Sequence, residues 1–307
     1  MTMPNVADKS SLTLTTTPDF LAEPAKPFAI GLKPLSDLNF LQIDHEFLEE
    51  RQQKSALYET MHDEICVAED DTLQAQREVE NLILNCLKTH HGDLYDFSAE
   101  GVTCRQTGAF FPHNPAMPIS SIGLIIPEDL VLMRRDESGW RLVGASLSFP
   151  ASWSLKDKFS KSLERVHAPV PLSDQMSQRI RRIFDHINPD IPVWRTNWSL
   201  SNDHRLRQEM RESEHSDRRK VMNPDVFFRT ELQTLHKLPV SGDILFTIST
   251  KMRRIKALAN DDKGRHKLAV LHRQYLNMND AERDYKGINR NADGLLAWME
   301  ENGNTEL

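Results

Sequence analysis

Histidine side chains are the first candidates for chemistry in this sequence, because a neutral imidazole nitrogen can bind a transition metal. His167 is the strongest of them. It follows a stretch predicted to be a helix and precedes the stiff segment Ala168-Pro-Val-Pro171, where the prolines restrict the backbone. Position alone leaves two interpretations of His167 open: a buried histidine hydrogen-bonded to the backbone, which is the ordinary case, and a metal ligand.

Three other histidines lie in segments without a helix or strand pattern. His90 and His91 precede a glycine, and His113 lies in the proline-rich stretch Phe111-Pro-His-Asn-Pro115. Loop residues generally lie at the surface. We expect these histidines to be solvated rather than to bind a metal.

A predicted strand carries two polar residues that could recognise an anion. Successive side chains of a strand point to opposite faces, so Arg195 and Asn197 share one face and Trp194, Thr196 and Trp198 share the other. An arginine offers a planar fork of donors that suits a carboxylate. If the Arg195 face is interior, the strand can bind an anion there.

A second predicted strand places Arg229, Glu231, Gln233 and Leu235 on one face. Buried polar groups cost free energy unless they are paired. This face is therefore either the wall of a polar pocket or the solvent-exposed side of the sheet, and the sequence favours the exposed side.

Several cofactor sites are not supported by the sequence. It has no GxGxxG, Walker or HExxH motif. The three cysteines, Cys66, Cys86 and Cys104, are scattered, so the chain cannot hold an iron–sulfur cluster by thiolates alone. An odd number of isolated cysteines also fits a reducing cytoplasm better than an oxidising compartment.

Charge and hydropathy limit the partners. The net charge is −7, which gives no reason to expect nucleic-acid binding. Residues 40–100 hold fifteen acidic against four basic residues, so the remainder is mildly basic. No signal peptide or membrane-spanning run is apparent, and we expect a cytoplasmic protein that is not embedded in a membrane.

Apolar spacing predicts the elements that position these residues. Residues 1–26 are rich in Ser, Thr and Pro and are expected to form a flexible tail. Helices are predicted within 47–65, 73–87, 155–166, 173–187 (with Ser173 as N-cap) and the tail 251–307. Short β-rich runs are predicted at 119–126, 130–133, 140–149, 193–200, 226–236 and 244–250, with a turn at Asp136-Glu-Ser-Gly139.

Two strands, then helices, then three strands define the expected architecture. This order is that of a PAS-like core, in which the inserted helices cover the sheet and enclose a ligand. We predict an α+β fold: a PAS-like antiparallel sheet with inserted helices over about 119–250, plus N-terminal and C-terminal helical additions. Together they form one domain, residues 27–307.

Several motifs, taken together, resemble the heme-dependent oxidative N-demethylase alpha-subunit family. They occur in family order over about residues 30–250. The matching stretches are Gly31-Leu-Lys-Pro-Leu35, Pro127-Glu-Asp-Leu-Val-Leu132, Ser148-Phe-Pro-Ala-Ser-Trp153 with Lys158, His167-Ala-Pro-Val-Pro171, Arg195-Thr-Asn-Trp198, and Arg229-Thr-Glu-Leu-Gln-Thr-Leu-His-Lys-Leu-Pro239 leading to Ser241-Gly and Phe246-Thr-Ile248.

The resemblance implies a protein that binds heme b and uses O₂ to remove a methyl group from a small secondary amine such as dimethylamine, releasing formaldehyde. Electrons would come from a separate reductase that carries FMN and [2Fe-2S]. His167 would be the axial ligand of the iron. Arg195, Trp198 and Glu231 would be pocket or propionate contacts.

Two departures from the family pattern keep other functions open. Leu232 stands where the family usually has Arg, and Pro127 where it usually has Gln. The loss of that arginine removes a cation that could contact a propionate. A non-catalytic heme-binding sensor or carrier is therefore the main alternative, and a cofactor-free interaction domain is the third.

Overall fold

The computed structural model describes residues 30–35, 39–168, 170, 174–210, 225–286 and 292–304. The predicted tail 1–26 and the predicted N-cap Ser173 lie outside the described residues. No helix within the described part of the chain combines the length and the apolar character that crossing a membrane requires. The extent of the domain, residues 27–307, stays a prediction.

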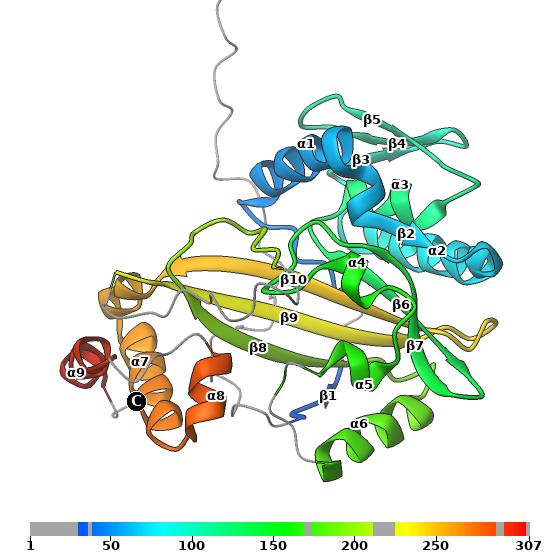
Figure 1. Cartoon of the computed structure of the whole chain (residues 1–307). Coiled ribbons are helices and arrows are strands. Elements are labelled where there is room, and N and C mark those ends of the chain that lie inside the picture. The colour runs from blue at the N-terminus through cyan, green and yellow to red at the C-terminus, as the bar shows by residue number, and fades with distance from the viewer. Residues whose placement is uncertain are drawn as a thin grey trace, which may run out of the picture.

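A seven-stranded sheet forms the centre of the molecule (Figure 1). Its strand order is β1-β8-β9-β10-β6-β7-β2, and every neighbouring pair is antiparallel. The strands are β1 (Lys33–Pro34), β2 (Cys66–Ala68), β6 (Asp129–Asp136), β7 (Gly139–Ser146), β8 (Val193–Ser201), β9 (Phe227–Lys237) and β10 (Ile244–Arg254). The predicted two-plus-three order of the central strands is confirmed.

The hairpin of β6 and β7 shows how local sequence fixes this sheet. Asp136 pairs with Gly139 across the predicted two-residue turn. Gly139 has φ 121°, a conformation that a residue without Cβ adopts readily. Along β6, Leu130 and Leu132 pack into one apolar cluster and Val131 and Met133 into another. Both faces of the sheet are therefore covered.

An N-terminal layer covers one face. It consists of α1 (Phe47–Ile65), the 3₁₀ helix η1 (Asp70–Thr72), α2 (Leu73–His90), α3 (Pro118–Ile125) and a small antiparallel sheet of β3 (Tyr95–Phe97), β4 (Gly101–Cys104) and β5 (Phe110–Pro112). The predicted helices at 47–65 and 73–87 are confirmed. The predicted strand at 119–126 is wrong, because Pro118 begins a helix whose Ile119, Ile122 and Ile125 are all buried. A short run that is apolar throughout fits either structure.

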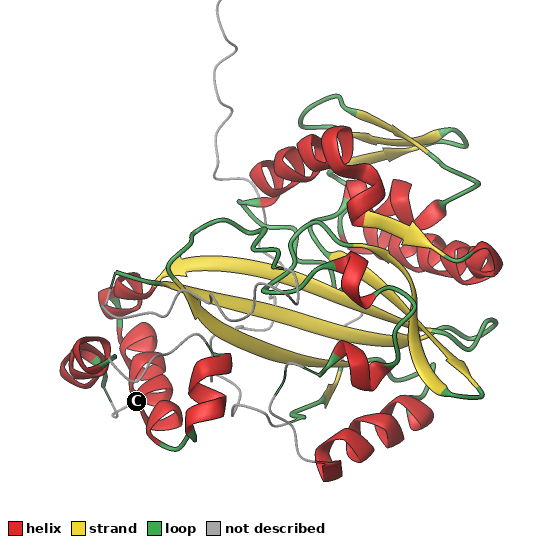
Figure 2. Cartoon of the chain, viewed as in Figure 1, coloured by secondary structure: helices red, strands yellow, loops and turns green. Residues whose placement is uncertain are grey.

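The inserted segment covers the opposite face, with α4 (Leu155–Lys158), α5 (Leu163–Val166) and α6 (Asp174–His186). The prediction of one helix over 155–166 is wrong: two short helices flank residues 159–162, where Ser160 has a positive φ of 58°. The return strand also ends earlier than predicted, at Ser146. Figures 1 and 2 show these helices beside the sheet.

The C-terminal addition contains the 3₁₀ helix η3 (Ile255–Asn260), α7 (Asp262–Leu276), α8 (Asp280–Tyr285) and α9 (Asp293–Asn302). Strand β10 extends to Arg254, four residues beyond its predicted end. In this addition Leu258, Leu268, Leu271 and Leu295 are buried in one cluster with Trp198 of β8. The class α+β with N-terminal and C-terminal helical additions is confirmed.

A buried carboxylate ties the N-terminal layer to the segment that leaves β7. Asp129 accepts hydrogen bonds from the backbone N–H groups of Ser148 and Phe149, both at 2.8 Å. Its Oδ1 lies 3.6 Å from Nζ of the fully buried Lys54 of α1. Lys54 also donates to the backbone oxygens of Gly123 and Glu128.

Replacing this carboxylate should be costly. In Asp129→Ala, Lys54 loses its ion pair and two backbone donors lose their acceptor, so we expect unfolding free energy to fall by about 3–5 kcal/mol. Urea denaturation measures the loss. The control Asp63→Ala removes a fully exposed carboxylate and should change stability by less than about 0.5 kcal/mol. A loss at Asp129 no larger than the control would refute the anchoring role.

Candidate functional site

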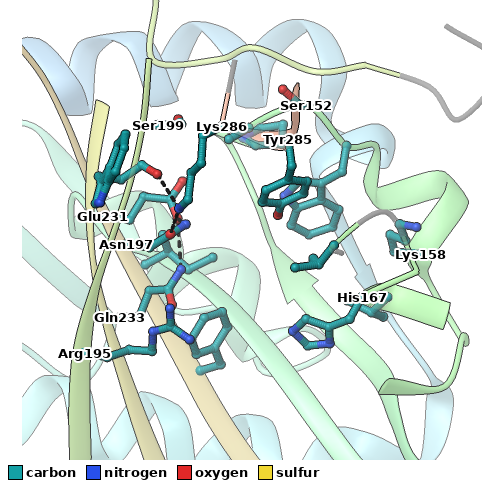
Figure 3. A pocket seen from close by; sticks show the side chains of 18 of the residues that line it. Ser152, Lys158, His167, Arg195, Asn197, Ser199, Glu231, Gln233, Tyr285 and Lys286 are labelled. Atoms are coloured by element: carbon teal, nitrogen blue, oxygen red, sulfur yellow. Dashed lines mark hydrogen bonds between the residues drawn. The ribbon is translucent and has the colours of Figure 1, made fainter. Parts of the chain in front are cut away.

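Two adjoining cavities lie between the sheet and the inserted segment. The larger has a volume of about 240 Å³ and the smaller about 130 Å³. Both are lined by His167, Arg195, Gln233 and Phe246, so they meet beside these side chains. The smaller cavity is mostly apolar, with Val131, Met133, Leu142, Leu163, Ile183, Phe184 and Leu235 in its wall. The larger cavity holds the polar groups shown in Figure 3.

His167 is placed by the short helix α5. Ser162 caps the helix by accepting a hydrogen bond from the N–H of Arg165, and His167 follows the last helical residue. The His167 Nδ1 lies 2.8 Å from the Leu163 carbonyl oxygen. A carbonyl oxygen can only accept, so Nδ1 carries the proton and Nε2 keeps its lone pair.

The surroundings of His167 also favour the neutral ring. Burial lowers the pKa of His167 below its usual value, and the charges of Arg195 and Lys158 lower it further, whereas the bond to Leu163 opposes the shift. Among the described residues, no hydrogen bond engages Nε2. A neutral imidazole with a free Nε2 and an oriented Nδ1–H is the form that binds iron.

Arg195 projects from β8 into the same space (Figure 3). Its buried Nε has no hydrogen-bond partner in the described part of the chain. Burial lowers the pKa of Arg195, and Glu231 partly opposes this effect. A buried guanidinium donor without an acceptor is costly, so this group is suited to an anion that enters the cavity.

Glu231 of β9 is held as a buried anion. Its Oε1 accepts from Nε of Arg229 at 3.1 Å, and its Oε2 accepts from Asn197 at 3.2 Å and from Gln233 at 2.9 Å. Burial alone would raise its pKa, but Arg229 and these amides outweigh it and lower the pKa. The prediction that this face is exposed is wrong: Arg229 is 1% and Glu231 8% exposed. Arg229 donates to the Phe149 and Leu206 carbonyls of the segments that follow β7 and β8.

The Trp198 side chain has its main contacts in the C-terminal cluster, unlike that of Arg195. Its ring centroid lies 6.0 Å from that of Phe228, and its Nε1 donates to Gln274 of α7 at 3.2 Å. The side chain thus joins the C-terminal cluster, although Trp198 also lines the larger cavity. A cofactor contact by Trp198 stays a prediction.

Lys286 and Tyr285 are lining residues that sequence patterns did not identify. Both come from the end of α8 in the C-terminal addition. Lys286 is 4% exposed, and its Nζ donates to Asn197 Oδ1 at 2.8 Å and to the Trp198 carbonyl at 2.7 Å. Burial, together with the charge of Arg195, lowers its pKa to about 7, although Glu231 opposes the shift. The only local signal is the capping box Asn279–Glu282 that begins α8.

The rim of the larger cavity is the segment after β7, residues 149–153. Ser152 has a positive φ of 60°, which is uncommon for a residue with a side chain. Its N–H donates to the Gln208 carbonyl, and the Phe149 carbonyl accepts from Arg229 Nη2 at 2.7 Å. The rim is thus fixed by the anchors Asp129 and Arg229 behind it.

The remaining candidate histidines lie elsewhere. His91 is buried rather than solvated, and its Nε2 lies 2.9 Å from Asn39 Oδ1; burial lowers its pKa to about 4. His113 pairs with Glu80 at 2.9 Å. Neither they nor His90 line the two cavities. The three cysteines are buried free thiols.

These features define a class of protein. An oriented neutral imidazole, an apolar compartment beside it and buried cationic groups at a polar end are the arrangement that suits a heme, whose macrocycle is apolar and whose propionates are anionic. Comparison with known families agrees. Residues 31–296 match the family described as haem-dependent oxidative N-demethylase, alpha subunit-like, and the chain belongs to this family. The resemblance drawn from the motifs is confirmed.

The electrostatic coupling of Arg195 to His167 can be measured. Removing the guanidinium charge in Arg195→Gln should raise the His167 pKa toward its usual value, because that charge disfavours the imidazolium. Nitrogen-detected NMR titration reports both the pKa and the tautomer, and Nδ1 should stay protonated in the neutral ring. Arg205→Gln, which alters an exposed ion pair with Asp203, should leave both unchanged. Equal His167 titration in all three proteins would contradict the coupling.

Proposed function

We propose that this protein binds heme b and acts as an oxidative N-demethylase: O₂-dependent removal of a methyl group from a small secondary amine, such as dimethylamine, with release of formaldehyde. The reaction would be (CH₃)₂NH + O₂ + 2e⁻ + 2H⁺ → CH₃NH₂ + HCHO + H₂O. The observation that carries the proposal is the free Nε2 of His167 at the junction of the two cavities. The family match supports the heme dependence.

The described residues fit the cofactor. His167 would hold the iron through Nε2, with the Leu163 carbonyl fixing the orientation of its ring. The apolar compartment would take the macrocycle, and Arg195, whose buried Nε lacks a partner, would bind a propionate. Glu231 would hold Asn197 and Gln233 in place through the hydrogen bonds to its carboxylate. We propose that the sheet of β6 to β10 is a PAS-like heme core, which its two-plus-three antiparallel order supports.

The chemistry of the reaction divides between cofactor and chain. Heme iron, when bound, supplies O₂ activation. The chain keeps the ring of His167 neutral and oriented, holds the rim segment 149–153 in place, and screens the site from solvent with apolar side chains such as Phe149 and Trp153. The two electrons are proposed to come from a separate reductase with FMN and [2Fe-2S], because the scattered free cysteines provide no cluster ligands. Free buried thiols also support a cytoplasmic setting.

A heme sensor or carrier without turnover is the second candidate. The sequence argument for this candidate is that Leu232 stands where the family usually has an arginine, a cation that could contact a propionate. In the structure Leu232 is 2% exposed and lies between Glu231 and Gln233, whose side chains line the cavity, so its own side chain points to the other face of β9. An arginine at this position would not reach the cavity from this strand. The departure therefore does not weaken the proposed pocket.

Heme uptake tests the ligand. The full chain, reconstituted with hemin, should develop a Soret band, and His167→Gly should bind hemin at least about tenfold more weakly, because the iron–imidazole bond is lost. Added imidazole should restore the spectrum by filling the vacated position. His113→Gly is the matched control, since His113 lies outside the cavities. Unchanged hemin binding and spectrum in His167→Gly would refute the assignment.

Turnover separates the enzyme from the sensor. Heme-loaded protein with NADPH and a flavin and [2Fe-2S] reductase should release one formaldehyde per dimethylamine consumed, with methylamine as the other product. Omission of O₂ should stop the reaction. Normal heme loading and reduction without formaldehyde from any of a panel of methylated amines would favour the sensor or carrier.

A further inference from the structure

The inserted segment has a cationic outer surface over the smaller cavity. Helix α6 is amphipathic: Ile180, Ile183 and Phe184 on one face line that cavity, while Arg179 and Arg182 on the other face are exposed. A helix with its side chains is about 10–12 Å across. The cationic surface is therefore separated from the cavity by the thickness of one helix.

Helix α5 continues this surface. Val166 lines both cavities, whereas the preceding Arg165 is exposed. Glu164 of α5 pairs with Arg181 of α6 at 2.6 Å, so the outer sides of the two helices adjoin (Figure 1). Among the described residues of the segment, the exposed cations are Lys156, Lys161, Arg165, Arg179, Arg181 and Arg182, and the exposed carboxylates are Glu164 and Asp185. We call the six cations the cationic face.

The two carboxylates do not neutralise this face. Glu164 is paired with Arg181, and Asp185 accepts from Trp140 Nε1 at 2.9 Å and pairs with Arg135 at 3.0 Å. Within the part of the chain that the structure describes, the five cations of the face other than Arg181 form no ion pair. The cationic face is thus available to an anionic partner.

The acidic part of the chain lies at the other end of the molecule. Residues 40–100 hold fifteen acidic against four basic residues. Figure 1 shows their helices α1 and α2 at the top and α5 and α6 at the bottom. A charged partner is attracted to one end and repelled by the other, so the charge distribution orients its approach.

We propose that the cationic face is the docking surface of the electron donor, and that the donor presents an acidic face there. The inference rests on the proposed function, in which a separate reductase supplies the electrons. Its ground is position together with charge. A carrier bound outside α6 would stand one helix away from the apolar cavity proposed for the macrocycle, and opposite charges would hold it in that place.

Other anionic partners fit the cationic face less well. A basic amphipathic helix binds a membrane by burying its apolar face in the lipid, but the apolar face of α6 lines the cavity. Its exposed positions between 176 and 187 include no apolar residue; they are Gln178, Arg179, Arg181, Arg182, Asp185 and His186. The net charge of −7 opposes binding to a nucleic acid. A protein with a complementary acidic face is the partner that these features favour.

Binding of a plant-type [2Fe-2S] ferredoxin to the full-length apoprotein tests the face without heme. This probe carries the type of cluster proposed for the reductase on an acidic surface. In Arg179→Glu/Arg182→Glu the association rate should fall about tenfold at an ionic strength of about 20 mM, because the steering charges are reversed. At about 0.5 M the difference should shrink below about twofold, because salt screens exposed charges. Surface plasmon resonance measures both rates.

The matched control is Arg77→Glu/Lys88→Glu. It changes the net charge by the same amount at two exposed cations of α2, away from the cationic face. Its association rate should stay within about twofold of wild type, because steering depends on where the charges lie. An equal slowing in both double variants would assign the effect to net charge and overturn the proposal. Thermal unfolding shows whether each variant is folded, and Arg179→Gln/Arg182→Gln replaces the reversal if it is not.

Electron transfer shows whether docking at this face is productive. One electron leaves the reduced ferredoxin cluster and reduces heme iron from Fe(III) to Fe(II). Anaerobic stopped-flow absorbance of the heme-loaded protein should show about tenfold slower reduction in Arg179→Glu/Arg182→Glu at low salt. Photoreduced deazariboflavin, a small uncharged reductant, should reduce wild type and both double variants at equal rates.

Failure of this inference is distinguishable from failure of the proposed function. No ferredoxin binding, or equal association rates in wild type and Arg179→Glu/Arg182→Glu, would overturn the docking face and leave the heme proposal standing. Absence of hemin binding would overturn the heme proposal, while the apoprotein experiment still reports on the face. Vesicles of phosphatidylserine and duplex DNA are the competing ligands: tighter binding of either than of ferredoxin, lost in Arg179→Glu/Arg182→Glu, would also overturn the assignment to an electron donor.

Discussion

The hydrogen bond between His167 Nδ1 and the Leu163 carbonyl decides what the site can do. It fixes both the direction and the tautomer of the ring, and thereby leaves Nε2 as the available nitrogen. The same carbonyl also accepts from the backbone N–H of His167 at 3.1 Å, so the single turn of α5 holds both the backbone and the ring of His167.

Buried charged side chains fix the rim segment 149–153 relative to the sheet. Asp129 accepts from Ser148 and from Phe149, the first residue of the rim. Arg229 donates to the Phe149 and Leu206 carbonyls while pairing with Glu231. Buried ionic groups contribute little to net stability, but removing one partner is costly. Their value here is positional: they connect the N-terminal layer, the sheet and the rim through groups that have only one satisfactory arrangement.

Sequence patterns predicted the sheet and the inward position of His167 better than the polar pocket. Strand order followed from alternation and turn residues such as Gly139, and the prolines after His167 marked its fixed position. The run 119–126 was misassigned because an apolar segment buried on all sides has no informative period. The face of Arg229 and Glu231 was taken as exposed because polarity alone does not distinguish solvent from a paired interior.

Lys286 could not be found from sequence, since its role depends on a contact between α8 and β8 that no local pattern records. Through that contact the C-terminal addition supplies a side chain to the cavity wall as well as core packing. The cluster around Leu268 and Leu295 covers the Trp198 face of β8, while Lys286 passes to the side where Arg195 and Asn197 lie. Strand β8 thus contributes core packing on one face and a cavity wall on the other.

The two cavities differ in a way that would give an amphipathic ligand one orientation. Apolar side chains surround the smaller cavity, and the larger one gathers Arg195, Lys286 and the Glu231 network. An amphipathic ligand gains free energy by burying its apolar part in the first and avoids an uncompensated desolvation cost only if its anionic part faces the second. His167 lines both cavities, so the asymmetry that would orient such a ligand would also determine which of its atoms meets the imidazole.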